Sequence, residues 1–258
     1  MSGIFESHAH YEDEAFSDDR EALIASLRDN GIEYVVNVGS SADTCHKTVE
    51  LVDKYPFFYG ALGIHPSDVD CVTEEDWRWI EDTCREHPRI VAVGEAGLDY
   101  YWEKDNRKRQ LEVFGYQIEM AKRLGLPLIV HSRDAALDTY TMMKESDASK
   151  AGGVVHCFSY HTEEAKKYLD LGFYIGVGGS STFKNAQKVR DVVKYTPLER
   201  ILLETDCPYL SPVPNRGRRN SSLNLPIIAQ NIADIKGIDT DEVVEVTAAN
   251  AKRMYGII

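Results

Sequence analysis

The sequence lacks the features that identify several large classes of protein. No run of about 18 apolar residues occurs, so we expect no segment that spans a membrane. The first residues contain neither a basic stretch nor an apolar core, so no secretory signal is predicted. The chain has no Cys-x-x-Cys pair, and its five cysteines are irregularly spaced. Reduced thiols and a cytoplasmic location are the interpretation that fits this cysteine usage.

An excess of basic residues is also missing. The chain has 29 Lys and Arg against 42 Asp and Glu, which gives a formal net charge of −13. A protein that binds long nucleic acid without sequence preference usually has a basic surface. A polyanionic substrate would therefore need a local basic patch, or metal ions, to be held by this chain.

Short apolar runs rich in β-branched or aromatic residues recur at regular intervals and predict strands. The predicted strands are Ile4–Ser7, Tyr34–Val38, Phe58–Gly63, Ile90–Gly94, Leu128–His131, Gly153–His156, Tyr174–Val177 and Ile201–Glu204. Amphipathic segments follow them and predict helices. The predicted helices are Asp19–Asn30, Ala42–Lys54, Trp77–His87, Arg107–Leu124, Ala135–Lys144, Glu163–Leu171, Asn185–Tyr195, Leu225–Lys236 and a last one over about Asp241–Tyr255.

Strand–helix alternation repeated eight times predicts a (β/α)8 TIM barrel of the α/β class. The alternative is a doubly wound open sheet, but no Gly-x-Gly-x-x-Gly follows the first strand. Neither a linker nor a low-complexity segment interrupts the pattern. With 43% hydrophobic residues, the 258-residue chain is large enough for one substantial core. We therefore expect a single domain over residues 1–258.

Polar side chains follow many of the predicted strands at their carboxyl ends, where the chemistry of such barrels is located. Five of the eight histidines lie at these positions. The positions are His8, His10, His65, Glu95, Asp99, His131, Arg133, His156, Glu204 and Asp206. The other histidines, His46, His87 and His161, are assigned to helix surfaces or loops. Taken together, the strand-end residues predict a convergent ring of imidazoles and carboxylates.

Such a ring predicts a metal site. His8 and His10 are two residues apart in an extended segment, so both imidazoles point to the same face. Imidazole and carboxylate are the ligands of zinc, manganese or magnesium in such sites. Cys157 and Cys207 each follow a proposed ligand, so in extended backbone their side chains would point away, as structural cysteines. Six ligands are too many for one tetrahedral ion: His8, His10, Glu95, His131, His156 and Asp206.

A bridging carboxylate resolves the excess of ligands. Glu95 lies between the His8/His10 pair and the His131/His156 pair in the order of the strands, so it is the candidate bridge between two ions. Two-metal sites favour hydrolysis, most commonly of phosphate esters. Asp206 is a candidate both for a ligand and for the group that orients the attacking water and takes its proton.

Several segments carry a resemblance to a known family. They include "SHAHYEDEAF", "ALGIHPSD", "VAVGEAGLDYYW", "GGVVHCFS", "ILLETDCPYLSPVP" and "TAANAKRMYG". The chain resembles the TatD-like metal-dependent deoxyribonucleases, which are amidohydrolase-type barrels, from residue 4 to residue 256. The resemblance implies the same six metal ligands as the strand-end argument, and it places His65 beside the site, in contact with phosphate or water. It also implies the substrate class, the phosphodiester bonds at DNA ends.

The chain departs from the family pattern at a few positions. Glu6 stands where the family usually has Asp, and Asn215 in "PVPNRG" stands where it usually has His. The usual "RNEP" is replaced here, because Ser221 and Ser222 follow Arg219 and Asn220. The six ligands are intact, so we expect a hydrolase whose rate or substrate preference is altered through the loop after the last strand.

Substrate contacts are expected from two further segments. Arg216, Arg218 and Arg219 form the one tight arginine cluster of the chain, and arginine pairs with phosphate in a bidentate manner. A solvated loop is the alternative interpretation. Tyr101, together with Tyr100 and Trp102, is positioned either to stack on bases of a single strand or to pack at the rim of the barrel.

Two other functions remain open from the residues alone. A metal-dependent amidase, lactonase or deacylase on the same barrel is the first, because a fold does not fix a chemistry. Many such relatives have a carbamylated bridging lysine, but the fourth predicted strand carries no lysine. The second is a non-catalytic metal-binding protein, against which the intact ligand set argues. We expect no membrane contact and no obligate protein partner.

Overall fold

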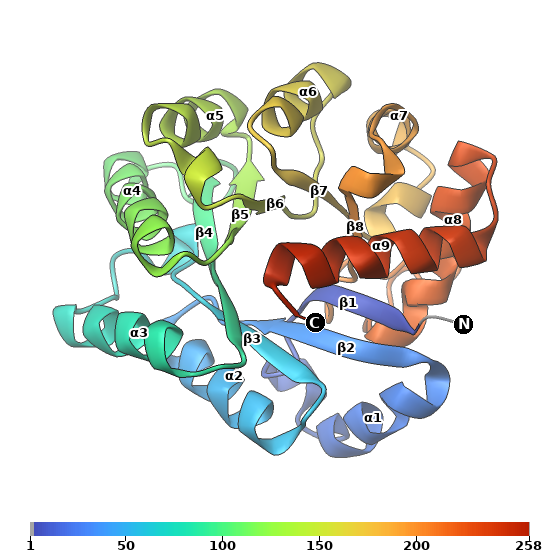
Figure 1. The fold of residues 1–258 in the computed structure, drawn as a ribbon, viewed down its shortest axis with the longest axis horizontal. Coiled ribbons are helices and arrows are strands. Elements are labelled where there is room, and N and C mark those ends of the chain that lie inside the picture. Colours follow the sequence, from blue (N-terminus) through green and yellow to red (C-terminus); the bar gives the residue numbers. More distant parts are fainter. Residues whose placement is uncertain (1–2, 258) are drawn as a thin grey trace.

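The computed structural model describes residues 3–257, which contain one eight-stranded parallel sheet in the order β1 to β8 (Figure 1). The strands are β1 (Ile4–Ala9), β2 (Ile32–Val38), β3 (Phe58–Leu62), β4 (Ile90–Asp99), β5 (Leu128–Arg133), β6 (Gly153–Val155), β7 (Tyr174–Val177) and β8 (Ile201–Leu203). Sequential order and parallel pairing agree with the predicted barrel.

The sheet closes on itself between its first and last strands. Ala9 forms a parallel bridge with Cys207, just after β8. The N–H of His10 donates to the carbonyl of Cys207 over 2.8 Å, and the N–H of Asp206 donates to the carbonyl of His8 over 3.0 Å. These bonds place the segment after β8 directly beside the end of β1. The predicted (β/α)8 barrel is confirmed.

Helices surround the barrel on its outside (Figure 1). They are α1 (Arg20–Leu27), α2 (Ala42–Lys54), α3 (Glu74–Glu86), α4 (Arg107–Leu124), α5 (Ala136–Glu145), α6 (Thr162–Asp170), α7 (Gln187–Tyr195), α8 (Leu225–Lys236) and α9 (Thr240–Tyr255). Within residues 3–257, no helix is both long and apolar enough to cross a membrane.

Local sequence explains where the helices begin and end. A capping box begins α2, since Ser41 accepts from the N–H of Thr44 while the Thr44 side chain bonds back to Ser41. The left-handed conformation of Gly125 ends α4. Helix α3 begins three residues before its predicted start because Thr73 and Asp76 form a second capping box. The predicted helix Asp19–Asn30 is shorter, because it passes into a 3₁₀ turn at Arg28–Asn30.

Two layers of apolar side chains form the core. The larger layer lies between the strands and the surrounding helices. The smaller layer fills the barrel and includes Phe5, Ile129 and Leu202 together with side chains of α9. The rings of Phe5 and Tyr255 stack with centroids 6.1 Å apart. Helix α9 therefore closes the end of the barrel at which the strands begin.

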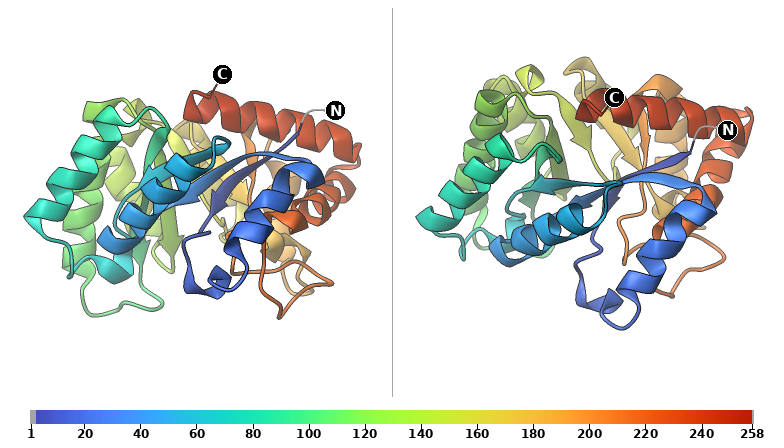
Figure 2. Two further views of the ribbon diagram at one scale, coloured as in Figure 1. Left: turned by 90° about the horizontal axis from the view of Figure 1, so that it is seen from below. Right: turned by 60° about the horizontal axis from the view of Figure 1, so that its bottom comes forward.

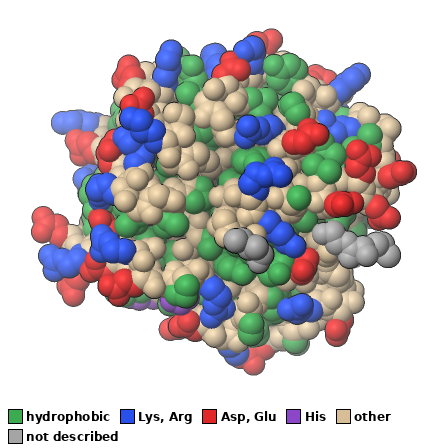
Figure 3. Space-filling model, in the orientation of Figure 1, with side chains coloured by type: hydrophobic (Ala, Val, Ile, Leu, Met, Phe, Trp, Pro, Cys, Tyr) green, Lys and Arg blue, Asp and Glu red, His purple; other side chains and the backbone are tan. Residues whose placement is uncertain are grey.

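The polar residues at the carboxyl ends of the strands lie at the opposite end of the barrel. Figure 2 shows the loops that follow β1, β4 and β8 on the side away from α9. The α9 face carries interspersed basic and acidic side chains, and histidine is visible only at its lower rim (Figure 3). A functional site built from strand-end residues is thus confined to one end of the molecule.

Strand β4 is longer than predicted. It continues past the predicted end at Gly94 to Asp99, because Ala96–Asp99 pair in register with Val130–Arg133 of β5. Gly97 permits this pairing: its φ is +152°, and an added Cβ would lie 1.9 Å from the carbonyl oxygen of His131. The extension places Glu95 and Asp99 inside the strand, on the same face.

Candidate metal centre

The six predicted ligands converge at the carboxyl ends of the strands. They lie in or just after β1, β4, β5, β6 and β8, and their side chains are at most 17% exposed. Parallel strands of a barrel end at one rim, so residues far apart in sequence meet there. The residues are His8, His10, Glu95, His131, His156 and Asp206.

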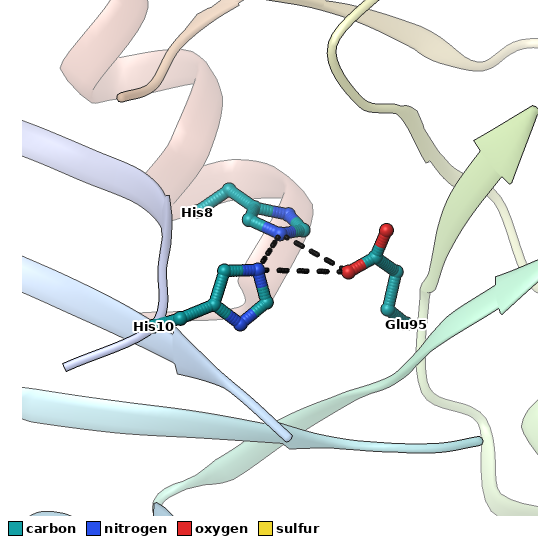
Figure 4. A group of neighbouring side chains, drawn as sticks. All are labelled: His8, His10 and Glu95. Atoms are coloured by element: carbon teal, nitrogen blue, oxygen red, sulfur yellow. Dashed lines mark hydrogen bonds and ion pairs between the residues drawn. The ribbon is translucent and has the colours of Figure 1, made fainter. Parts of the chain in front are cut away.

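One set of groups surrounds the Oε2 atom of Glu95. The Nε2 atoms of His8 and His10 lie 3.5 and 3.6 Å from this oxygen, and they are 3.1 Å from each other (Figure 4). Asp206 faces the same two rings, with its Oδ1 atom 3.7 Å from His8 and 3.4 Å from His10. Two imidazoles and two carboxylates thus point at a common space.

A second set surrounds the other oxygen of Glu95. The Oε1 atom lies 2.9 Å from Nδ1 of His131 and 2.7 Å from Nε2 of His156. His65, on the loop after β3, approaches the same oxygen to 3.8 Å through Nε2. The two oxygens of Glu95 therefore face two different groups of histidines, as a bridging carboxylate would.

The chemistry of the donors fits divalent cations. The Nδ1–H of His10 donates to the carbonyl of Val38 over 2.8 Å, so in the neutral ring the Nε2 atom carries no proton. This bare nitrogen faces Nε2 of His8 across 3.1 Å, next to two carboxylates. Two nitrogen lone pairs at that distance repel unless a cation or a proton lies between them. Imidazole nitrogens and carboxylate oxygens suit zinc or manganese.

Two of the groups, Glu95 and His8, have the charge states of metal ligands, whereas neighbouring carboxylates outweigh burial and raise the pKa values of His10 and His156. Burial would raise the pKa of Glu95, but the surrounding His156, His131 and His8 hold it well below its ordinary value. Burial and the nearby His156 lower the pKa of His8 to about 4. At neutral pH, Glu95 is ionised and His8 is neutral, and these are the forms that bind a cation.

His131 has a further carboxylate partner that the sequence analysis left without a role. Its Nε2 atom lies 3.1 Å from Oδ2 of Asp99. Burial lowers the pKa of His131, but the hydrogen bonds with Asp99 and Glu95 outweigh it and raise the pKa to about 9. The sequence does contain a signal for Asp99, because residues 95 and 99 of one strand share a face.

Glu204 and Glu12 are two more buried carboxylates beside the ligands. Glu204 accepts from the N–H of Cys157 over 2.6 Å, and burial raises its pKa to about 8. Its ligand atoms form a close group with those of His8 and His156, all within 4.8 Å of one another. Glu12 lies 3.4 Å from Nδ1 of His10.

Cys157 and Cys207 do not follow their neighbours in extended backbone, so the predicted reason for their pointing away from the ligands is wrong. The backbone is not extended there, since Cys157 has a φ of 46° and Asp206, before Cys207, has a φ of 58°. Among residues 3–257, neither cysteine belongs to a group that could hold a metal ion. Cys207 is fully buried. Turns at the strand ends, not alternation along a strand, separate these thiols from the ligands.

The arginines predicted to contact substrate differ in their surroundings. Arg219 forms a bidentate ion pair with Asp19 over 2.7 and 2.6 Å. A phosphate would have to compete with that carboxylate. The guanidinium of Arg216 lies over the ring of Phe183, 4.4 Å from its centroid. Arg218 is exposed and pairs with no carboxylate of the described chain.

The aromatic residues after β4 divide between the two uses that the sequence allowed. Tyr100 is buried and donates its hydroxyl to Asp138 over 2.8 Å, so it packs at the rim. Tyr101 and Trp102 are 45% and 68% exposed.

Asn215, where the family usually has histidine, donates to the side chain of Asn224 over 2.8 Å.

Comparisons with known proteins agree with this arrangement. The chain is 41% identical to the uncharacterized metal-dependent hydrolase YabD of Bacillus subtilis over 254 residues, which cover 98% of this chain and 99% of YabD. It is 35% identical to the uncharacterized metal-dependent hydrolase YcfH of Escherichia coli, covering 98% of this chain and 96% of YcfH.

A solved structure extends the likeness to the whole fold. The crystal structure of YJJV, a TatD homolog from Escherichia coli, matches with a TM-score of 0.93 at 28% identity, covering 99% of this chain and 98% of that chain. The sequence model of the family described as TatD related DNase matches residues 5–256. The chain therefore belongs to the TatD-related DNase family.

Proposed function

We propose that the protein is a metal-dependent hydrolase that cleaves phosphodiester bonds at the ends of DNA, with two divalent cations bridged by Glu95. The proposal rests on the way in which the two oxygens of Glu95 face different histidines. Oε2 faces His8 and His10, whereas Oε1 faces His131 and His156. Magnesium, manganese and zinc are the candidate ions.

Each residue at the centre has a role in this proposal. His8, His10 and Asp206 would hold one cation, His131 and His156 would hold the other, and Glu95 would contact both. Bound cations would neutralise charge on a phosphate and make a water molecule more acidic. The ionised Asp206 accepts the proton of the attacking water. His65, 3.8 Å from Oε1 of Glu95 at the edge of the site, contacts the phosphate or that water.

The choice of DNA as substrate is supported by the family and by the charge of the chain. The matching family is described as TatD related DNase. The net charge of −13 opposes binding along a duplex and suits a site that engages one end. Arg216 and Arg218, in the loop after β8, supply local positive charge. A cytoplasmic location, and action without an obligate protein partner, complete the proposal.

The test is degradation of 3′-labelled single-stranded and duplex DNA by metal-free protein, with magnesium, manganese or zinc added back. Glu95→Gln and Asp206→Asn should abolish metal-restored trimming from an end. Glu245→Gln is the matched control, because Glu245 is an exposed carboxylate on α9, at the opposite end of the barrel. Cutting that survives Glu95→Gln would refute the site assignment. Absence of cutting by the metal-loaded wild type would turn attention to ester and amide substrates.

A further inference from the structure

Two of the four proposed histidine ligands have a second ring nitrogen that is buried without a partner. Within residues 3–257, the Nδ1 atoms of His8 and His156 form no hydrogen bond. The other two histidines differ: Nδ1 of His10 lies 2.8 Å from a backbone carbonyl, and Nε2 of His131 lies 3.1 Å from a carboxylate. A histidine that binds a metal almost always donates its other N–H to a second group. We therefore looked for the group that serves His8 and His156.

The Nδ1 atoms are the ones that carry the protons when cations are bound as proposed. Nε2 of His8 points at Oε2 of Glu95 across 3.5 Å (Figure 4), and Nε2 of His156 lies 2.7 Å from Oε1 of the same carboxylate. The Nε2 atoms thus face the proposed cations, and a neutral imidazole then has its proton on Nδ1. Each ring carries a buried N–H donor that requires an acceptor.

Glu204 offers an acceptor next to both rings. Its Oε2 atom is also buried and forms no hydrogen bond within the described chain. One nitrogen of His8, one nitrogen of His156 and one oxygen of Glu204 lie within 4.8 Å of one another. The two rings stack with their centroids 4.0 Å apart and an interplanar angle of 8°, so a single group can reach both. Two histidines that need an acceptor therefore have a common carboxylate neighbour.

The surroundings of Glu204 fix its position. The residue is 1% exposed, and its Oε1 atom accepts from the N–H of Cys157 over 2.6 Å. Gly176 on β7 lies against the other oxygen, because a Cβ added there would be 2.5 Å from Oε2. Cys157 directly follows His156 in the chain. One oxygen of Glu204 thus holds the backbone beside His156, which leaves the other oxygen for the rings.

A single water molecule is the link that the spacing favours. Two partners of one water molecule lie about 4.5 Å apart, because each hydrogen bond is about 2.8 Å long and the angle between them is near tetrahedral. A group that spans up to 4.8 Å matches this geometry. The water oxygen accepts from both Nδ1–H groups, and one of its O–H groups donates to Oε2 of Glu204, which satisfies three buried atoms at once. A third cation could not take this place, because nitrogens that carry protons are not ligands.

We propose that Glu204 is a positioning residue for both cations, and that it orients the rings of His8 and His156 through one shared buried water molecule. The inference rests on the proposed function, and it adds a carboxylate that acts on one ligand of each cation. Asp99, in contrast, contacts the ligand His131, which belongs to one cation only. Loss of the Glu204 carboxylate therefore lowers the affinity for both cations, whereas loss of the Asp99 carboxylate lowers the affinity for one.

Zinc titration of the metal-free full chain, in competition with a chromophoric chelator, tests the inference. Glu204→Gln keeps an oxygen for the N–H of Cys157 and replaces Oε2 by an NH2 group, which cannot accept. Both zinc affinities should fall about 10- to 100-fold. Asp99→Asn should lower one affinity only. Glu6→Gln is the matched control and should keep both near the wild-type values, because Glu6 is an equally buried carboxylate whose partners include two hydroxyl groups that can also accept.

The imidazole N–H resonances provide a readout that a merely structural role would not move. In zinc-loaded protein with nitrogen-15-labelled histidine, Glu204→Gln should shift the Nδ1–H resonances of His8 and His156 and speed their exchange with solvent. The resonances of His10 and His131 should stay in place. Thermal unfolding of the metal-free variants verifies that the fold is intact. Glu204→Asp, which withdraws the carboxylate by one methylene, is the second variant and should show the same two losses of affinity.

The outcomes separate the positioning role from the proposed function. Wild-type affinity for both zinc ions in the two Glu204 variants, loss of one ion only, or equal losses in Glu6→Gln would overturn the positioning role. A wild type that binds two zinc ions but does not cut DNA would overturn the nuclease and leave the positioning role supported. A wild type that binds no zinc would overturn both.

Discussion

The hydroxyl of Ser222 donates a hydrogen bond to the carboxylate of Glu6 over 2.9 Å, and both side chains are fully buried. Both are positions at which the chain departs from the pattern of its family, which usually has aspartate and proline there. The same carboxylate accepts from the hydroxyl of Thr205 over 2.6 Å. A longer acid on β1 thus reaches a hydroxyl before α8 that proline could not supply.

We expect the two departures to be energetically coupled. Glu6→Asp withdraws the carboxylate by one methylene from two buried hydroxyl donors and should cost about 1–3 kcal/mol of stability. Ser222→Ala should cost about 1 kcal/mol. A double-mutant cycle by urea unfolding should give a coupling energy of at least about 0.5 kcal/mol. Ser146→Ala, in the loop after α5, is the control, and its change in unfolding free energy should add to that of Glu6→Asp. If the changes for Ser222→Ala and Glu6→Asp were also additive, the coupling would be contradicted.

The sequence predicted the features that depend on the alternation of strands and helices and on the topology of the barrel. The barrel follows from the repeated strand–helix pattern, and the convergence of the six proposed ligands follows from the common rim at which parallel strands end. What it missed depends on contacts between distant segments. The pairing of Arg219 with Asp19 and the contact of Glu6 with Ser222 join residues about 200 positions apart. Nothing in the local pattern of these segments indicates which partner each residue meets.

Asp99 is expected to position His131 for metal binding. Asp99→Asn keeps an oxygen for the backbone N–H groups of Tyr101 and Trp102, but it replaces the carboxylate that lies 3.1 Å from His131. The substitution should lower metal affinity about 10- to 100-fold, as measured by competition with a chromophoric chelator. Asp105→Asn, an exposed carboxylate on the same loop, is the control. An unchanged affinity in Asp99→Asn would limit Asp99 to a structural role in the loop.

Metal removal is expected to lower thermal stability through mass action. A ligand that binds only the folded state adds about 2.7 kcal/mol when its free concentration exceeds Kd a hundredfold. Zinc or manganese should therefore raise the Tm of the chelator-treated wild type, and Glu95→Gln should lose most of this shift. Glu245→Gln should retain the full shift. A metal-induced rise in Tm that is equal in Glu95→Gln would exclude Glu95 as a shared ligand.

We expect Arg219 to contribute to the stability of the fold and Arg218 to contribute to substrate binding. The hydrogen bonds from Arg219 lower the pKa of Asp19 below its ordinary value of 3.8. A carboxyl group whose pKa is lower in the folded state than in the unfolded state stabilises the fold at pH values above its unfolded-state pKa. This stabilisation is lost as the pH falls through the folded-state pKa. Arg219→Ala should therefore be less stable than wild type at pH 7, and the difference should shrink below about pH 3.8. Arg218→Ala should leave stability unchanged at both pH values and weaken DNA binding; a stability loss in both variants would contradict the distinction.

We expect the fold to require glycine at position 176 on β7, because the carboxylate of Glu204 occupies the space in which a side chain would lie. A Cβ added at Gly176 would lie 2.5 Å from Oε2 and 2.8 Å from Cδ of that buried side chain. Gly176→Ala should therefore destabilise the fold by about 1–3 kcal/mol through overpacking. Gly115→Ala is the matched control, since Gly115 lies inside α4 and its added Cβ would meet only the sulfur of Met142 at 3.7 Å. That change should stabilise by about 0.5–1 kcal/mol, because alanine favours a helix interior. Equal urea midpoints for the two variants would mean that Glu204 can move away from β7 without cost, and packing would then not fix its position beside the proposed ligands.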